Sequence, residues 1–164
     1  MDAIHCLKTR RSIRSFAPGE VDPEIVDDLI DCARLAPTAM NKQPWTFVVI
    51  RDEATRHRIV GIAGHGEFFR AAPVGIAVCC EEWDYWKEDG STAAMSLLLA
   101  AHAHGLGAVW LSMEPHAYAG EVKALLGIPA GVHLLAIIVL GPPAESPVVE
   151  KKALADVTRH ERWA

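Results

Sequence analysis

The chain has 164 residues, of which 51% are hydrophobic and 23% are charged, and this length predicts one domain over residues 1–164 that needs no disulfide or metal to fold. Sixteen Lys and Arg against 21 Asp and Glu give a net charge of −5, which argues against a nucleic-acid-binding protein. The mean hydropathy of +0.15 is high for a small monomer, so we expect a subunit interface.

The first half of the chain is expected to be mainly helical. Residues 2–9 predict a short helix with Ile4 and Leu7 facing inward. Asp22 and Pro23 are an N-cap acid and a first-turn proline, and the helix that they start is expected to run to the next proline, at residue 37. The elements expected after it are a polar loop, a strand and two helices, over residues 38–44, 45–50, 52–63 and 67–71.

An uncharged segment of 24 residues runs from Gly90 to Met113 and is long enough to span a membrane. Two histidines lie inside it, and a Gly-Leu-Gly sequence at residues 105–107 interrupts it. We therefore predict no membrane association, and a helix over residues 94–103 that is buried at a subunit interface. The other elements expected in this half are strands over 74–80, 108–112 and 133–140, an acidic and aromatic loop over 81–90, and a helix over 115–126.

Four short strands and five or six helices indicate an α/β or α+β fold. The segment 141–164 contains Pro142, Pro143 and Pro147, so it is expected to begin in an extended conformation. We expect this segment to leave the domain as a C-terminal arm that wraps a partner subunit.

The cysteines indicate neither a disulfide framework nor a metal site. Cys6 and Cys32 are isolated, and the adjacent Cys79 and Cys80 are expected to be buried in a strand as small hydrophobic residues. The N-terminus has an acid at position 2 and lacks the apolar segment of a signal peptide. We therefore expect a reduced, cytoplasmic protein.

Three polar motifs are candidates for ligand binding. The first is a basic cluster made of Arg10, Arg11, Ser12 and Arg14. Arginine donates two hydrogen bonds at once to phosphate, although a solvated basic turn has the same composition. The second motif, Lys151-Lys152, could supply further cations to the same phosphate or be a solvated pair on a flexible end.

The third motif is the loop over residues 37–45, which prolines bracket. Thr38, Asn41 and Gln43 supply donors and acceptors at close spacing. A rigid polar loop of this kind suits a planar ligand rich in heteroatoms, while an ordinary helix-to-strand connection remains the alternative interpretation.

Together these motifs resemble the nitroreductase family of FMN-dependent oxidoreductases. The matching segments are RRSIR, the loop from Pro37 to Trp45, an uncharged core segment and a basic tail ending in ERW, at residues 10–14, 37–45, 89–112 and 151–163. They occur in the order expected for the family. The resemblance implies an α+β fold with a mainly antiparallel sheet flanked by helices. It also implies an intertwined homodimer with two FMN sites at the interface.

The resemblance also implies a role for individual residues. It places Arg10, Arg11 and Ser12 at the FMN phosphate and ribityl chain, and Arg14 at the pyrimidine edge of the flavin. Lys151 or Lys152 would reach the phosphate. Four residues would come from the other subunit, namely Pro37, Thr38, Asn41 and Gln43. The backbone at Leu111 and Ser112 would lie near flavin N5.

The activity implied is that of an FMN-dependent oxidoreductase. It would pass a hydride from NAD(P)H through N5 to a small acceptor, such as a nitroaromatic or a quinone, by a ping-pong mechanism. No catalytic side chain is required, and without a GxGxxG motif the nicotinamide is expected to share the flavin pocket. An FMN store or sensor without nicotinamide turnover is the alternative, and a cofactor-free interaction domain is a further one.

No sequence motif marks the residues on the substrate side of the pocket. Its candidate residues are Met40, Met113, Phe69 and Trp83. For each of them packing inside the protein is the competing interpretation. Trp83, Tyr85 and Trp86 could form either a lid over the pocket or a dimer surface.

Overall fold

One antiparallel sheet organises the computed structural model, which describes residues 2–163. Its strands follow the order β1-β2-β4-β3, so β2 and β4 are central and β1 and β3 are edges. The strands are β1 (Trp45–Ile50), β2 (Val74–Glu81), β3 (Gly107–Ser112) and β4 (Val132–Gly141). On the outer side of β3, Ser12 forms a parallel bridge to Ala108 at the start of the strand.

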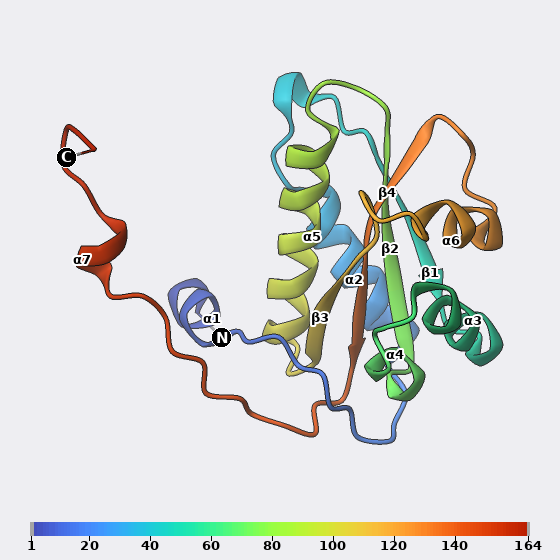
Figure 1. The fold of residues 1–164 in the computed structure, drawn as a ribbon. Coiled ribbons are helices and arrows are strands. Elements are labelled where there is room, and N and C mark those ends of the chain that lie inside the picture. Colours follow the sequence, from blue (N-terminus) through green and yellow to red (C-terminus); the bar gives the residue numbers. More distant parts are fainter. Residues whose placement is uncertain (1, 164) are drawn as a thin grey trace.

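Helices cover both faces of the sheet (Figure 1). One face carries α2 (Pro23–Arg34) and α5 (Trp86–Ala103), and α1 (Ala3–Thr9) packs on the outer side of α5. The opposite face carries α3 (Glu53–Ala63), α4 (Phe68–Ala71) and α6 (Ala119–Leu126). A 3-10 turn, Ala39–Asn41, lies between α2 and β1, and α7 (Leu154–Val157) lies in the C-terminal tail.

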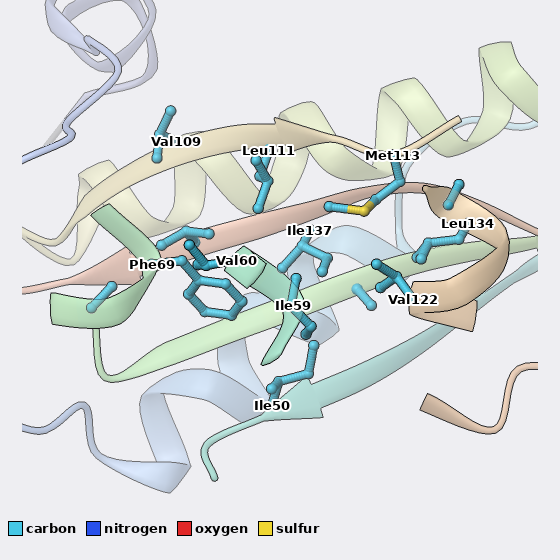
Figure 2. Close-up of a cluster of buried hydrophobic side chains, with 14 of the residues drawn as sticks. Ile50, Ile59, Val60, Phe69, Val109, Leu111, Met113, Val122, Leu134 and Ile137 are labelled. Carbon is cyan, nitrogen blue, oxygen red and sulfur yellow. The ribbon is translucent and has the colours of Figure 1, made fainter. Parts of the chain in front are cut away.

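The sheet separates two hydrophobic clusters. Figure 2 shows the cluster under α3, α4 and α6, in which Phe69 packs against Val109 and Ile137 from the two adjacent strands. The second cluster joins Ile76 and Ile138 to α2 and α5. Because both faces are covered, the central strands are apolar along nearly their whole length rather than alternating.

The α+β class with a mainly antiparallel sheet is confirmed, and so is the capped start of α2. The side chain of Asp22 accepts a hydrogen bond from the Glu24 amide at 2.9 Å, and Pro23 opens the helix. Three inward residues then fix its packing on the sheet, namely Val26, Leu29 and Ala33. Gly64 and Gly127 end α3 and α6 in the left-handed conformation.

Two expected boundaries differ. The acidic segment expected as a loop is partly helical, because α5 begins at Trp86 and carries Glu88 and Asp89 in its first turn. Negative charge is favourable at a helix N-terminus, so these acids start the helix rather than keep the segment irregular. On the opposite face, α6 begins at Ala119, after a turn over residues 115–118.

The inward orientation expected for Ile4 and Leu7 is wrong for the single chain. Their side chains are 58% and 54% exposed, and Cys6 is the residue of α1 that is buried. The Cys6 thiol donates to the Leu99 carbonyl oxygen at 3.4 Å. The apolar side of α1 therefore faces away from its own domain.

The C-terminal tail starts on the domain and then leaves it. Pro143 pairs with Phe16, and the Ala144 amide donates to the Ser15 carbonyl at 2.9 Å. Beyond this point the tail runs away from the sheet (Figure 1). Its large apolar side chains are mostly solvent-exposed, among them Val148, Leu154, Val157 and Trp163. Within residues 2–163, no helix combines the length and apolar character needed to cross a membrane.

Candidate functional site

The basic motif and the tail form one hollow of about 320 Å³ at the start of β3. Its lining residues are Arg10, Arg11, Ser12, Arg14, Glu145, Pro147, Val149 and Lys151. Two of the three sequence motifs thus meet in space although about 140 residues separate them. Lys152 is not among the lining residues, so the structure brings Lys151 and not Lys152 to the cluster.

The backbone fixes the basic cluster to the domain. Arg10 caps α1, with its amide donating to the Cys6 carbonyl at 3.1 Å, and the Ile13 amide donates to the Ala108 carbonyl at 3.0 Å. The Arg11 guanidinium donates to the carbonyls of Lys8 and Arg10 at 2.9 and 2.7 Å. One Arg11 nitrogen is therefore occupied by the end of α1, while the rest of the guanidinium has no protein acceptor among these contacts.

Glu145 completes the hollow and was missed in the sequence. Its Oε1 atom accepts hydrogen bonds from the Arg14 amide and from the Ser15 amide, the latter at 3.0 Å. A carboxylate bound to two adjacent backbone amides fixes the turn that carries Arg14. Only the fold brings Glu145 next to this turn, since no local pattern links residues 14 and 145.

His102 lies beside the basic cluster. Its pKa is lowered, first because the ring is partly buried and then because Arg10 lies nearby. Its Nε2 atom is 2.8 Å from the Thr9 hydroxyl. The basic cluster is therefore close to the C-terminal end of α5. His104 lies on another side of that helix and pairs with Asp28 at 2.6 Å. Within the described chain, no group of three or more metal-ligating side chains gathers.

The polar loop over residues 37–44 lies at the opposite end of α5 (Figure 1). The Ala39 amide donates to Asp89 Oδ1 at 3.0 Å, and the Thr92 hydroxyl donates to the Pro37 carbonyl at 3.0 Å. Asp89 is only 3% exposed, and its Oδ2 atom is buried without a hydrogen-bond partner. Asp89 therefore joins the loop to the first turn of the helix.

The loop has an unusual backbone. Met40, Asn41 and Gln43 have φ angles of 51°, 53° and 51°, a left-handed conformation that side chains disfavour. The Gln43 amide donates to the Thr38 hydroxyl oxygen at 3.2 Å. Such a conformation persists only where surrounding contacts impose it, and the hydrogen bonds of Thr38, Thr92 and Asp89 supply those contacts.

A single chain does not bring the loop and the basic cluster together. Asp89 contacts the loop and His102 lies by the basic cluster, and these residues are 13 positions apart on α5. At 1.5 Å per residue this corresponds to about 20 Å along the helix. The polar atoms of Asn41 and Gln43 are therefore far from the hollow of their own chain.

The free edge of β3 connects to the basic cluster. The Ala108 carbonyl faces this edge, because it accepts from Ile13, and the Ser112 carbonyl faces it too, because it accepts from the Tyr118 hydroxyl at 2.9 Å. In an antiparallel strand alternate residues turn both backbone groups to the same side. Trp110 and Ser112 thus direct their amides to the free edge. Leu111 directs its own to β4, so of the two predicted backbone positions only Ser112 is available.

The four candidates for a substrate pocket separate into two groups. Phe69 and Met113 are 0% exposed and pack in the cluster of Figure 2. Their burial contradicts a place on the pocket wall. Met40 is 84% exposed on the polar loop, and Trp83 is partly buried with an unpartnered indole nitrogen. Trp86 stacks on His133 with 3.9 Å between ring centroids, and Tyr85 lies edge-on to Trp83.

Cys79 and Cys80 are buried in β2, as expected. Burial raises the pKa of Cys79 to about 11 and that of Cys80 to about 12. Both side chains are therefore protonated and unreactive near neutral pH. They do not contribute a redox pair to the site.

Comparison with known proteins matches most of the chain to one family. A family model described as "Nitroreductase family" matches residues 7–66 and 62–142. A protein from Methanothermobacter thermautotrophicus, with the provisional name NADH dehydrogenase/NAD(P)H nitroreductase, is 37% identical over 169 residues, which cover 99% of this chain and 88% of that protein.

Solved structures agree with this match. An FMN-dependent nitroreductase from Clostridium difficile superposes with a TM-score of 0.91 at 28% identity, covering 98% of this chain and 99% of that one. A protein from Desulfovibrio desulfuricans, solved in complex with FMN, superposes with a TM-score of 0.85 at 28% identity, covering 100% and 99%.

Proposed function

Because the chain belongs to the nitroreductase family of oxidoreductases, we propose that it binds FMN and uses it to transfer electrons from NAD(P)H to a small acceptor. The family match confirms the resemblance drawn from the four sequence motifs. The proposal of FMN is supported by the C. difficile and D. desulfuricans proteins described above, which share the fold.

The basic hollow carries this proposal. Arg10, Arg11 and Lys151 are three cations around about 320 Å³ of space, with Arg14 beside them, and guanidinium and ammonium groups are the usual partners of phosphate. The donor set therefore fits the phosphate of FMN. Glu145 lowers the net charge of the hollow, but its oxygen is already engaged by backbone amides. In this arrangement it orients the turn and leaves the cations free for the ligand.

The free edge of β3 suits the other end of the cofactor. Ser112 is four residues beyond Ala108, where the basic segment joins the strand, and this equals about 13 Å at 3.3 Å per residue. An elongated molecule with a phosphate at one end and a heteroatom-rich ring at the other could use both places. The amides of Trp110 and Ser112 would be donors to the flavin.

A second copy of the chain would complete the site. Since Asn41 and Gln43 lie at the far end of α5 from the hollow, we propose that they reach the flavin of the partner, together with Pro37 and Thr38. Met40 and Trp83, which belong to the same end of the molecule, remain proposed contacts of the substrate. The arrangement requires a homodimer with two equivalent sites.

Exposed apolar surface supports this dimer. A groove of about 400 Å³ lies between α1 and α5, and Ile4 and Leu7 are exposed beside it. The detached tail carries further apolar side chains, with Leu154 and Trp163 79% and 90% exposed. Surface of this kind is typical of an interface. We propose that the arm over residues 141–164 wraps the partner subunit.

Bound FMN would supply the redox chemistry by accepting a hydride at N5 and passing it on. The chain would bind and orient the cofactor, and Arg14 near the pyrimidine edge would stabilise negative charge that develops on the ring. Nitroaromatics and quinones are the proposed acceptors, with donor and acceptor using one open face in turn. The cytoplasmic location expected from the sequence stays a prediction.

The absorbance spectrum of the purified protein tests the proposal, followed by anaerobic titration with NADH and NADPH. We expect flavin bands that one or both nicotinamides bleach and that a quinone restores. A yellow protein that neither nicotinamide bleaches would favour an FMN store or sensor. A colourless protein that fails to bind added FMN would refute the assignment of the hollow.

A further inference from the structure

Three polar rings gather at the end of β3 and have no role in the site described so far. His65 comes from the loop between α3 and α4, and His116 and Tyr118 come from the turn before α6. His65 Nε2 is 2.7 Å from the Tyr118 hydroxyl, and that hydroxyl is 2.9 Å from the Ser112 carbonyl oxygen. His116 stacks on Tyr118 with 5.0 Å between ring centroids.

The direction of these hydrogen bonds follows from the hydrogens available. The Tyr118 hydroxyl has one hydrogen, and the Ser112 carbonyl can only accept, so Tyr118 donates to Ser112. His65 must then donate from Nε2 to the tyrosine oxygen. Burial raises the pKa of Tyr118, so the hydroxyl keeps its hydrogen near neutral pH. The result is a donor chain from His65 through Tyr118 to one backbone carbonyl.

The position of His65 is set by the glycine that follows it. Gly66 has a φ of +84°, and a Cβ atom there would lie 2.9 Å from Leu111 Cδ1. The loop therefore lies against the Leu111 side chain of β3, and its left-handed backbone at Gly66 favours glycine. The contact holds the imidazole within reach of Tyr118.

Ser112, like Ala108 and Trp110, turns both of its backbone groups to the free edge of β3. Its carbonyl is occupied by Tyr118, whereas its amide has no partner from β4 because of the strand alternation. At this point the edge therefore presents a free donor, the Ser112 amide, and a weakened acceptor, since the Ser112 carbonyl already uses one of its two lone pairs for Tyr118. Flavin N5 responds to that difference, because it accepts a hydrogen bond when oxidised and carries a hydrogen to donate when reduced.

We propose that Tyr118, held by His65, is a positioning residue that masks the Ser112 carbonyl, so that this end of β3 favours oxidised over reduced FMN. This inference rests on the proposed function, since it requires FMN along the edge of β3. The mask lowers the midpoint potential of the bound cofactor. Reduced FMN then passes its electrons to an acceptor more readily.

The test is a spectroelectrochemical titration of the holoprotein, the Tyr118→Phe variant and the Tyr85→Phe variant. Phenylalanine keeps the ring that stacks on His116 and removes only the hydroxyl. In Tyr118→Phe the reduced flavin gains one hydrogen bond, which raises its affinity relative to the oxidised form by about tenfold. We therefore expect the midpoint potential of this variant to rise by about 30 mV for a two-electron couple. Tyr85→Phe removes the other tyrosine hydroxyl of the chain and is expected to leave the potential unchanged.

A second pair of variants keeps the inference testable if Tyr118→Phe does not fold. His65→Ala removes the donor that holds Tyr118, and His57→Ala removes a half-buried histidine of α3 as its control. A positive shift of the midpoint potential in His65→Ala that is smaller than the shift in Tyr118→Phe, with no shift in His57→Ala, would support the mask. An unchanged or more negative potential in both Tyr118→Phe and His65→Ala would overturn it while FMN binding stands. A chain that binds no FMN would overturn the proposed function as well.

Discussion

Replacing Asp89 with alanine tests how the protein maintains its strained polar loop. Asp89 is buried in the first turn of α5, and within residues 2–163 its carboxylate accepts one hydrogen bond, from the Ala39 amide at 3.0 Å. The loop that follows has three left-handed residues, which cost about 1–3 kcal/mol each. Without the carboxylate we expect the loop to relax. Binding of FMN would then have to restore the ordered loop, and the free energy that this requires would lower the affinity for the cofactor.

The size of the effect follows from that one hydrogen bond. A buried amide left without a partner costs about 1–3 kcal/mol, and about 1.4 kcal/mol corresponds to a factor of ten in affinity. We therefore expect the FMN dissociation constant of Asp89→Ala to rise by about 5- to 150-fold. Asp89→Asn keeps an oxygen that can accept from Ala39, so its affinity should stay close to that of the native protein.

Titration of the apoprotein with FMN, followed by flavin fluorescence, measures this constant. Glu88→Ala is the matched control, because Glu88 is an exposed acid in the same helical turn and reports any effect of charge at the helix N-terminus alone. An Asp89→Ala affinity within twofold of the native value would refute the reasoning. So would an Asp89→Asn variant that binds as weakly as Asp89→Ala.

Two further predictions concern the basic hollow and the buried thiols. Lys151→Ala should weaken FMN binding by about tenfold, as expected for one charge-assisted hydrogen bond, while Lys152→Ala should change it less than twofold; equal losses in fluorescence titrations would contradict the assignment. Because Cys79 and Cys80 have pKa values of about 11 and 12, both should resist alkylation by iodoacetamide at pH 8 in the native protein. The unfolded thiols lose protons from about pH 9 upward. The free energy of unfolding that comes from burying them is therefore complete below about pH 9 and falls as the pH rises further. Denaturant titrations at pH values on both sides of about pH 9 measure this fall.

Local patterns predicted those elements whose signals lie within a few residues. The Asp22-Pro23 start and the apolar strands each depend on neighbours in sequence, and the structure has them in place. The start of α5 was missed because acidic residues are common in loops and equally favourable in the first turn of a helix.

Burial was harder to predict than secondary structure. The apolar spacing of α1 identifies which residues share a side, but it does not say whether that side meets its own domain, and Ile4 and Leu7 are exposed. For Phe69 and Met113 a short apolar segment fits a pocket wall and a core equally well. Packing between α4, β3 and β4 buries both side chains in the core.

The site itself depends on contacts between distant residues. The motifs identified Arg10, Arg14 and Lys151, which the fold brings to one hollow. Glu145 and the His65–Tyr118 pair could not be found in this way. Their partners are 131 and 53 residues away, and nothing in the local sequence marks them.

The central claim is that one chain supplies the phosphate hollow and its partner supplies the loop, and mixing two defective subunits tests it most directly. One variant carries Arg10→Ala and Lys151→Ala, the other carries Asn41→Ala and Gln43→Ala, and different affinity tags allow the mixed dimer to be purified. Each variant alone should bind little FMN. The mixed dimer should contain one intact site of two and bind about half the FMN of the native dimer, whereas a mixed dimer that binds no more FMN than its parents would contradict a site shared between subunits.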